Sequence, residues 1–124
     1  MPVPILKQGD VLIASVQDAL TDSDLRELQN NLVDRVGRFR SRGVVIDVTV
    51  LDVMDSFAVR TLRAIAHMTR LRGAETVVAG IQPDVAFSMV RLGLTLDDVA
   101  TVLDLDEGLA LLRSRRDGRP GRGR

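Results

Sequence analysis

The chain has no cysteine, tryptophan or tyrosine, one histidine, and only 2% aromatic residues among its 124 positions. The absence of cysteine excludes disulfides, thiolate metal sites and cysteine nucleophiles. The scarcity of aromatic side chains leaves few stacking platforms for bases, which argues against binding of single-stranded nucleic acid. We do not expect nucleic acid as a partner. No apolar run is long enough for a signal peptide or a membrane span, so we expect a cytoplasmic protein that does not enter membranes.

The two signs of charge are separated along the chain, although the formal net charge is +0. Residues 113–124 contain six arginines and one aspartate, and residues 1–112 contain the other 11 basic and 16 acidic side chains. The basic end is rich in glycine and lacks aliphatic residues, which is typical of disorder. We therefore expect one folded domain over residues 1–115, with an aliphatic core, and a disordered tail over residues 116–124.

Strand-forming and helix-forming segments alternate along the chain, which predicts an α/β fold. The expected strands cover residues 3–7, 11–16, 44–48, 76–79 and 99–103. The expected helices begin after Thr21, at Ser56, at Pro83 and after Asp106. Residues 8–10 form a hairpin signal between the first two strands, so we expect a small mixed β-sheet with helices mainly on one face.

The first expected helix carries clear local signals. Thr21 is its expected N-cap, and Asp24 completes a near-capping box three residues later. Its expected apolar face has spacings of three and four and consists of Leu25, Leu28, Leu32, Val36 and Phe39. The second helix is expected to end at Gly73 and the third at Gly93.

The most informative segment is residues 44–62, which reads as a buried strand, an acidic turn and a helix that begins with Ser56. Three carboxylates, those of Asp47, Asp52 and Asp55, are expected around the Ser56 hydroxyl. Functional residues of α/β proteins usually lie in loops at the carboxyl ends of strands. An Asp-Ser pair at a helix start is also ordinary capping, so these residues alone leave both interpretations open.

The helix after Ser56 carries a basic stripe. Arg60, Arg63, His67 and Arg70 recur at spacings of three and four, so they share a face opposite the apolar one. Such a stripe is usually a solvated surface. Because it starts beside Ser56, it is also a candidate recognition surface for a charged partner.

No constellation of catalytic residues is visible. His67 lies eleven positions after Ser56 on the same helix, about 16 Å away, which is too far for a nucleophile and its base. The glycines form no phosphate-binding loop, and the acidic residues lack the spacing of a calcium loop. We therefore expect a protein that is not an enzyme and uses no cofactor or metal.

Several short motifs together resemble a known family. They are residues 45–49 (Val-Ile-Asp-Val-Thr), 54–57 (Met-Asp-Ser-Phe), 80–84 (Gly-Ile-Gln-Pro-Asp), 92–94 (Leu-Gly-Leu) and 4–7 (Pro-Ile-Leu-Lys). Over roughly residues 3–115 the sequence resembles the STAS domain of anti-sigma-factor antagonists, and most narrowly the RsbS-type antagonist of the bacterial stressosome. Phe57-Ala58 follows the serine, where sporulation-type antagonists have Ser-Gly or Thr-Gly.

The resemblance implies a scaffold and antagonist that self-associates and assembles with RsbR-type STAS paralogues. Such an assembly sequesters an RsbT-type serine/threonine kinase, which phosphorylates the serine matching Ser56 and is then released. A PP2C-type phosphatase resets the serine. The candidate partner-binding residues are Asp47, Thr49, Asp52, Asp55, Arg60, Arg63 and Ser88. Thr49 and Ser88 are expected in neighbouring loops, where we favour a role in capping the sheet ends.

Three alternatives remain open at this stage. The chain is either a stressosome component or a free-standing anti-anti-sigma factor that binds an anti-sigma kinase directly, and Phe57 counts against the latter. A ligand-binding STAS module for a nucleotide or lipid lacks support because no phosphate loop is present. A hydrolase that uses Ser56 as nucleophile lacks a base within reach.

Overall fold

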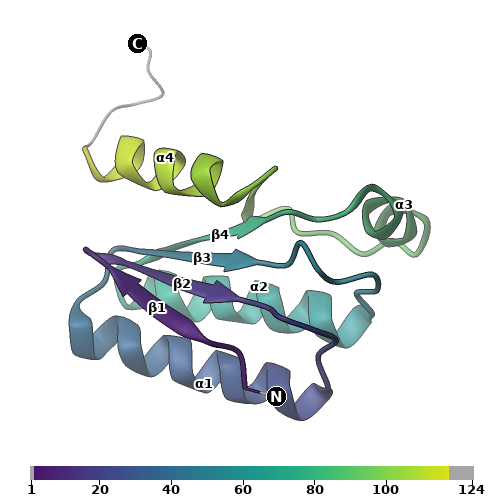
Figure 1. Cartoon of the computed structure of the whole chain (residues 1–124), viewed down its shortest axis with the longest axis horizontal. Coiled ribbons are helices and arrows are strands. Elements are labelled where there is room, and N and C mark those ends of the chain that lie inside the picture. Colours follow the sequence, from purple (N-terminus) through teal and green to yellow (C-terminus); the bar gives the residue numbers. More distant parts are fainter. Residues whose placement is uncertain (1, 118–124) are drawn as a thin grey trace.

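The computed structural model describes residues 2–117, which form a five-stranded sheet with helices on both sides (Figure 1). The elements follow the predicted order. They are β1 (Ile5–Gln8), β2 (Val11–Ser15), α1 (Asp22–Phe39), β3 (Gly43–Asp47), α2 (Ser56–Leu71), β4 (Glu75–Ala79), α3 (Pro83–Arg91), β5 (Ala100–Val102) and α4 (Leu105–Arg116). The mixed α/β fold class predicted from the sequence is confirmed.

The strands lie in the order β1-β2-β3-β4-β5. β1 and β2 form the predicted antiparallel hairpin, and all later neighbours are parallel. β3 is therefore the central strand, with Val45 opposite Ile13 on one side and Val77 on the other. The chain leaves β3 and β4 at the same end of the sheet, and the loops toward α2 and α3 meet there (Figure 1).

Two helices cover one face of the sheet and a third covers the other (Figure 1). α1 and α2 pack together over the larger core, which includes Leu12, Leu32, Ile46, Leu62 and Ile65, none more than 2% exposed. α4 packs on the opposite face, where Leu112 joins Val45, Val77 and Ala79. The sequence did not assign α4 to that face, because only its spacing of apolar residues was visible.

The predicted capping box at the start of α1 is confirmed. The Thr21 hydroxyl accepts a hydrogen bond from the Asp24 N–H at 3.0 Å, and the Asp24 carboxylate accepts one from the Thr21 N–H at 3.0 Å. The backbone hydrogen bond from Thr21 lowers the pKa of Asp24 below its ordinary value. Four of the five residues predicted for the apolar face are buried, namely Leu25, Leu28, Leu32 and Val36.

The prediction for Phe39 was wrong, because its side chain is 43% exposed. Phe39 is the last residue of α1, and the helix ends there with Arg40 in the left-handed region (φ 52°). Instead of entering the core, the Phe39 ring lies beneath two cations, Lys7 Nζ at 5.9 Å and the Arg38 guanidinium at 5.5 Å.

The predicted N-cap of the last helix was also wrong. Asp104, not Asp106, caps α4, and its carboxylate accepts a hydrogen bond from the Glu107 N–H at 2.8 Å. Asp104 directly follows an extended segment, whereas Asp106 already lies in the first helical turn. Arg116, the first residue of the predicted tail, belongs to α4 and pairs with Asp10. The remaining predicted tail from residue 118 onward lies outside the described residues.

Candidate functional site

The candidate site is the loop between β3 and α2, at the carboxyl end of the central strand. Ser56 is the first residue of α2, as predicted, and its side chain is exposed. Within the loop Leu51 and Met54 are buried and anchor it to the core, whereas Asp52 and Val53 face solvent. These two buried residues therefore fix the position of the loop that leads to the exposed Ser56.

Asp55 is the N-cap of α2. Its carboxylate accepts a hydrogen bond from the Ala58 N–H at 2.8 Å, and its carbonyl accepts one from the Val59 N–H at 3.0 Å. The capping interpretation is therefore confirmed for Asp55. Because Asp55 supplies the cap, the Ser56 hydroxyl has no part in these two bonds.

We expect Asp55→Ala to lower the free energy of unfolding by about 1 kcal/mol, because an alanine N-cap leaves a helical N–H without an acceptor. Urea unfolding followed by circular dichroism measures this change. Asp52→Ala is the matched control in the same loop, and we expect it to stay within about 0.5 kcal/mol of the wild type. Equal losses in both variants would contradict the assigned cap.

Asp47, predicted near Ser56, forms hydrogen bonds with Thr49. Its Oδ1 accepts hydrogen bonds from the Thr49 hydroxyl at 2.6 Å and the Thr49 N–H at 3.0 Å. The Thr49 carbonyl accepts a further bond from Gln82 Nε2 at 2.6 Å. Thr49 thus joins the β3–α2 loop to the turn before α3.

Gly80 makes this junction possible. It has a φ of +86°, and a Cβ atom there would lie 2.1 Å from the Thr49 hydroxyl oxygen. Only glycine combines that backbone conformation with so close an approach. The turn at residues 80–82 therefore packs directly against the loop that carries Ser56.

Ser88 was predicted to lie in a loop. It lies instead on α3, where its side chain is exposed. The expectation that Ser88 caps a sheet end from a loop was wrong, because Ser88 lies within a helix and its side chain is exposed. Its carbonyl accepts a hydrogen bond from the Leu92 N–H at 3.0 Å, which belongs to the helix end.

The basic stripe on α2 is exposed along its whole length, as predicted. Arg60 lies four residues after Ser56, so the two side chains are neighbours on the helix surface. Arg60, Arg63 and His67 line a shallow hollow with Asp98, and Arg70 donates a hydrogen bond to the Asp98 carbonyl at 2.9 Å. That bond offsets part of the repulsion between the four basic side chains.

The sequence did not reveal several exposed apolar side chains near the loop. Val50 and Val53 are 48% and 75% exposed, and Phe87, Val90 and Leu92 on and after α3 are 67%, 80% and 69% exposed. Figure 1 places α3 and the β3–α2 loop at the same end of the sheet. Exposed apolar side chains gathered at one end are typical of a protein-binding surface.

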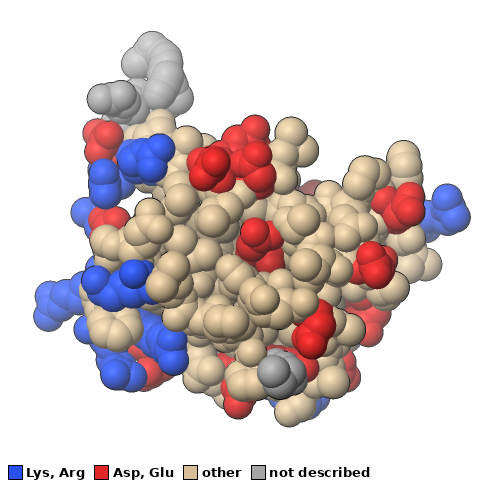
Figure 2. All heavy atoms as spheres, viewed as in Figure 1, with Lys and Arg blue, Asp and Glu red and all other residues tan. Residues whose placement is uncertain are grey.

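Charged side chains are distributed unevenly over the surface. Figure 2 shows Asp and Glu mostly toward the end that carries the candidate site, and Lys and Arg mostly toward the opposite end. Within residues 2–117 no group of three or more His, Asp or Glu side chains is arranged to hold a metal ion. None of the helices in this range is long and apolar enough to cross a membrane.

Comparisons with known proteins point to one family. The profile described as the STAS domain matches residues 3–107. An RsbS variant from Moorella thermoacetica is 33% identical, with a TM-score of 0.80, over 93% of this chain and 97% of that one. A chain from a structure of the stressosome, described as a signal integration and transduction hub, is 31% identical, with a TM-score of 0.74, over 91% and 98% of the two chains.

RsbRA, an RsbT co-antagonist protein of Bacillus subtilis (strain 168), is 33% identical over 84 residues. The match covers 68% of this chain and 31% of RsbRA. The chain therefore spans about a third of the length of this curated relative, whereas it aligns with almost all of the RsbS structure.

Proposed function

The chain belongs to the STAS domain family, and from this premise we propose that it is a scaffold and antagonist in a stressosome-type complex. It sequesters an RsbT-type serine/threonine kinase and releases it when Ser56 is phosphorylated. The observation that carries the proposal is the exposed Ser56 at the first position of α2, on a loop fixed by other residues. The likeness to RsbS over nearly the whole chain supports the choice of complex.

The domain is suited to tolerate a phosphate at Ser56. The free N–H groups and the dipole at the start of a helix favour a negative charge there. Arg60 lies one turn further along the same helix and offers a nearby positive charge. Because Asp55 already caps α2, modification of the Ser56 hydroxyl leaves the cap in place.

A docked kinase meets a different surface after phosphorylation. Asp52 and Asp55 already make the loop acidic, and a phosphate adds about −1.5 to −2 charges at neutral pH. Like charges brought together at an interface cost several kcal/mol, which corresponds to roughly a hundredfold loss of affinity or more. Exposed apolar side chains such as Val53 and Phe87 form the uncharged part of the surface that the kinase covers.

The same proposal includes further partners. RsbR-type STAS paralogues join the chain in the assembly, and a PP2C-type phosphatase removes the phosphate from Ser56. The chain also self-associates, as a homodimer or within a larger assembly. It contributes a binding surface and a phosphate acceptor, and we assign it no catalytic step.

We expect an RsbT-type kinase with Mg-ATP to add a single phosphate to the wild type, mapped to Ser56. Ser56→Ala is expected to gain none, and intact-mass spectrometry with peptide mapping measures both. Ser88→Ala is the matched control, since it removes another exposed hydroxyl at the same end and should leave incorporation unchanged. No incorporation into folded wild type by an active kinase would refute the kinase-substrate role.

A further inference from the structure

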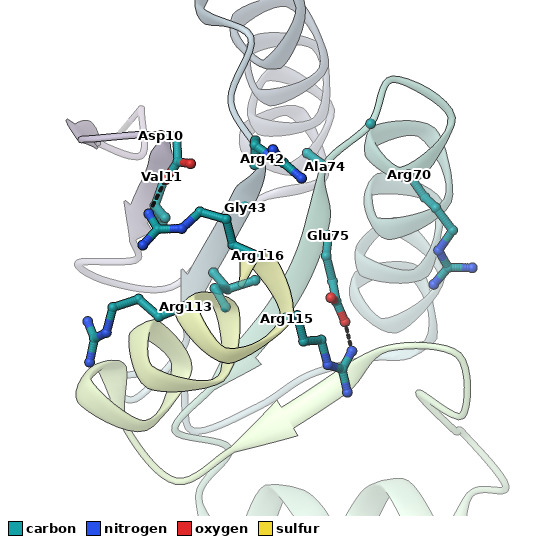
Figure 3. A pocket seen from close by; sticks show the side chains of 12 residues that line it. Asp10, Val11, Arg42, Gly43, Arg70, Ala74, Glu75, Arg113, Arg115 and Arg116 are labelled. Atoms are coloured by element: carbon teal, nitrogen blue, oxygen red, sulfur yellow. Dashed lines mark hydrogen bonds and ion pairs between the residues drawn. The ribbon is translucent and has the colours of Figure 1, made fainter. Parts of the chain in front are cut away.

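The end of the molecule opposite Ser56 is basic (Figure 2). Two hollows open there. The larger, about 510 Å³, lies between α4 and the first residues of β2, β3 and β4 (Figure 3). The smaller lies between the C-terminal turns of α1 and α2. Arg42 and Gly73 line both hollows, so the two are neighbours.

The carboxylates at this end are already paired with arginines. Arg116 Nη1 lies 3.3 Å from the Asp10 carboxylate, and Arg115 pairs with Glu75 (Figure 3). On α1, Asp34 pairs with Arg38 at 3.2 Å. These acids therefore do not neutralise the other cations at this end.

Three arginines of the smaller hollow have no such partner. Within residues 2–117 the guanidinium groups of Arg40, Arg42 and Arg72 make no ion pair and no hydrogen bond. Arg72 packs directly over Gly37, where a Cβ atom would lie 2.0 Å from its Nη2 atom. The glycine thus leaves the space in which the Arg72 guanidinium approaches the end of α1.

A buried hydroxyl lies between the first two of these arginines. Ser41 lines the smaller hollow and is 3% exposed, and among the described residues its hydroxyl oxygen has no hydrogen-bond partner. Buried hydroxyl groups almost always have a partner, because leaving one unpaired is destabilising. The hollow therefore combines uncompensated positive charge with an unused hydrogen-bond donor.

We propose that the smaller hollow binds the phosphate group of a small molecule. Arg40, Arg42 and Arg72 supply charged donors, because guanidinium groups match phosphate oxygens in charge and geometry. The Ser41 hydroxyl supplies a further donor. The C-termini of α1 and α2 each contribute about half a negative charge, so a net charge of about +2 remains for a phosphate dianion.

The non-phosphate part of such a ligand can occupy the larger hollow, because Arg42 lines both hollows. A small ligand fits better than a nucleic acid because the three free arginines surround one concavity and the chain has few aromatic side chains for base stacking. The proposal is independent of the Ser56 switch, which lies at the other end of the sheet.

Isothermal titration calorimetry with inorganic pyrophosphate tests the site. We expect saturable one-to-one binding by the wild type and at least about tenfold weaker binding by Arg42→Gln and by Arg72→Gln. Arg91→Gln, at the exposed end of α3, is the matched control and should change the affinity by less than about twofold. Ser41→Ala should also weaken binding while the ligand-free protein unfolds at an equal or higher temperature.

Two further binding experiments distinguish a site for a small phosphorylated molecule from a site for lipid headgroups or for nucleic acid. The same proteins are mixed with vesicles that contain phosphatidic acid and with a short DNA duplex. The proposal is overturned by the absence of saturable pyrophosphate binding, by equal weakening in Arg91→Gln and Arg72→Gln, or by binding to the vesicles or the duplex alone. Circular dichroism of each variant confirms that the compared proteins are folded.

Discussion

Ser56→Asp is expected to bind an RsbT-type kinase at least about a hundredfold more weakly than the wild type. The substitution places a negative charge at the position of the phosphate, next to Asp52 and Asp55. The fold should be unaffected, because an acidic residue in the first turn of a helix is favourable by about 0.3 to 1 kcal/mol. Affinity is measured by calorimetry, and stability by thermal unfolding of the same preparations.

Ser56→Asn is the matched control, since it has nearly the size of aspartate but no charge. We expect it to keep most of the kinase affinity. If Ser56→Asp bound the kinase as tightly as the wild type, electrostatic release would be refuted. If both variants lost affinity equally, the effect would be one of shape rather than charge.

Gly80→Ala is expected to lower the free energy of unfolding by about 2 to 4 kcal/mol. About 1 to 2 kcal/mol comes from forcing a residue with a side chain into the left-handed region. The rest comes from the new Cβ, which displaces the Thr49 hydroxyl and weakens its bond to Asp47 and the bond from Gln82 to the Thr49 carbonyl. Urea unfolding gives the difference.

Gly93→Ala separates the two contributions. Gly93 also has a positive φ (+72°), but no atom lies within 4 Å of the position of its Cβ. We expect this variant to lose only the backbone contribution of about 1 to 2 kcal/mol. Equal losses in the two variants would show that the contact between Thr49 and the turn contributes nothing to stability.

The order and type of the elements could be predicted because they depend on local patterns. The capping box of α1 and the start of α2 at Ser56 follow from residues at most three positions apart. The failures concern choices that the pattern leaves open. Asp104 and Asp106 can both cap a helix, and only the backbone path out of β5 selects Asp104.

The candidate site was predicted less completely than the fold. The sequence identified the loop and the position of Ser56, but it did not show that the Asp47 side chain bonds to Thr49. The direction of the Asp47 side chain depends on the geometry of the turn after β3, which the spacing of residues does not encode. The exposed apolar residues Val53 and Phe87 were missed because the sequence does not show which apolar loop and helix residues lack a packing partner.

The basic end shows the same limit. The run of arginines toward the C-terminus was visible in the sequence, yet the three arginines of the smaller hollow come from the segments that follow α1 and α2. Residues 40 and 72 are 32 positions apart and meet only because the two helices end side by side. Contacts between distant segments of this kind follow from packing and not from local sequence.

The most direct test of the proposed function is the dissociation of a preformed complex between the chain and an RsbT-type kinase. The complex is held on a biosensor surface, and Mg-ATP is added. We expect ATP to accelerate release of the kinase from the wild type, in step with phosphate incorporation at Ser56, and to leave the Ser56→Ala complex intact. Equal retention of the kinase by both proteins, with Ser56 of the wild type fully phosphorylated, would contradict the proposal that this phosphate is the release signal.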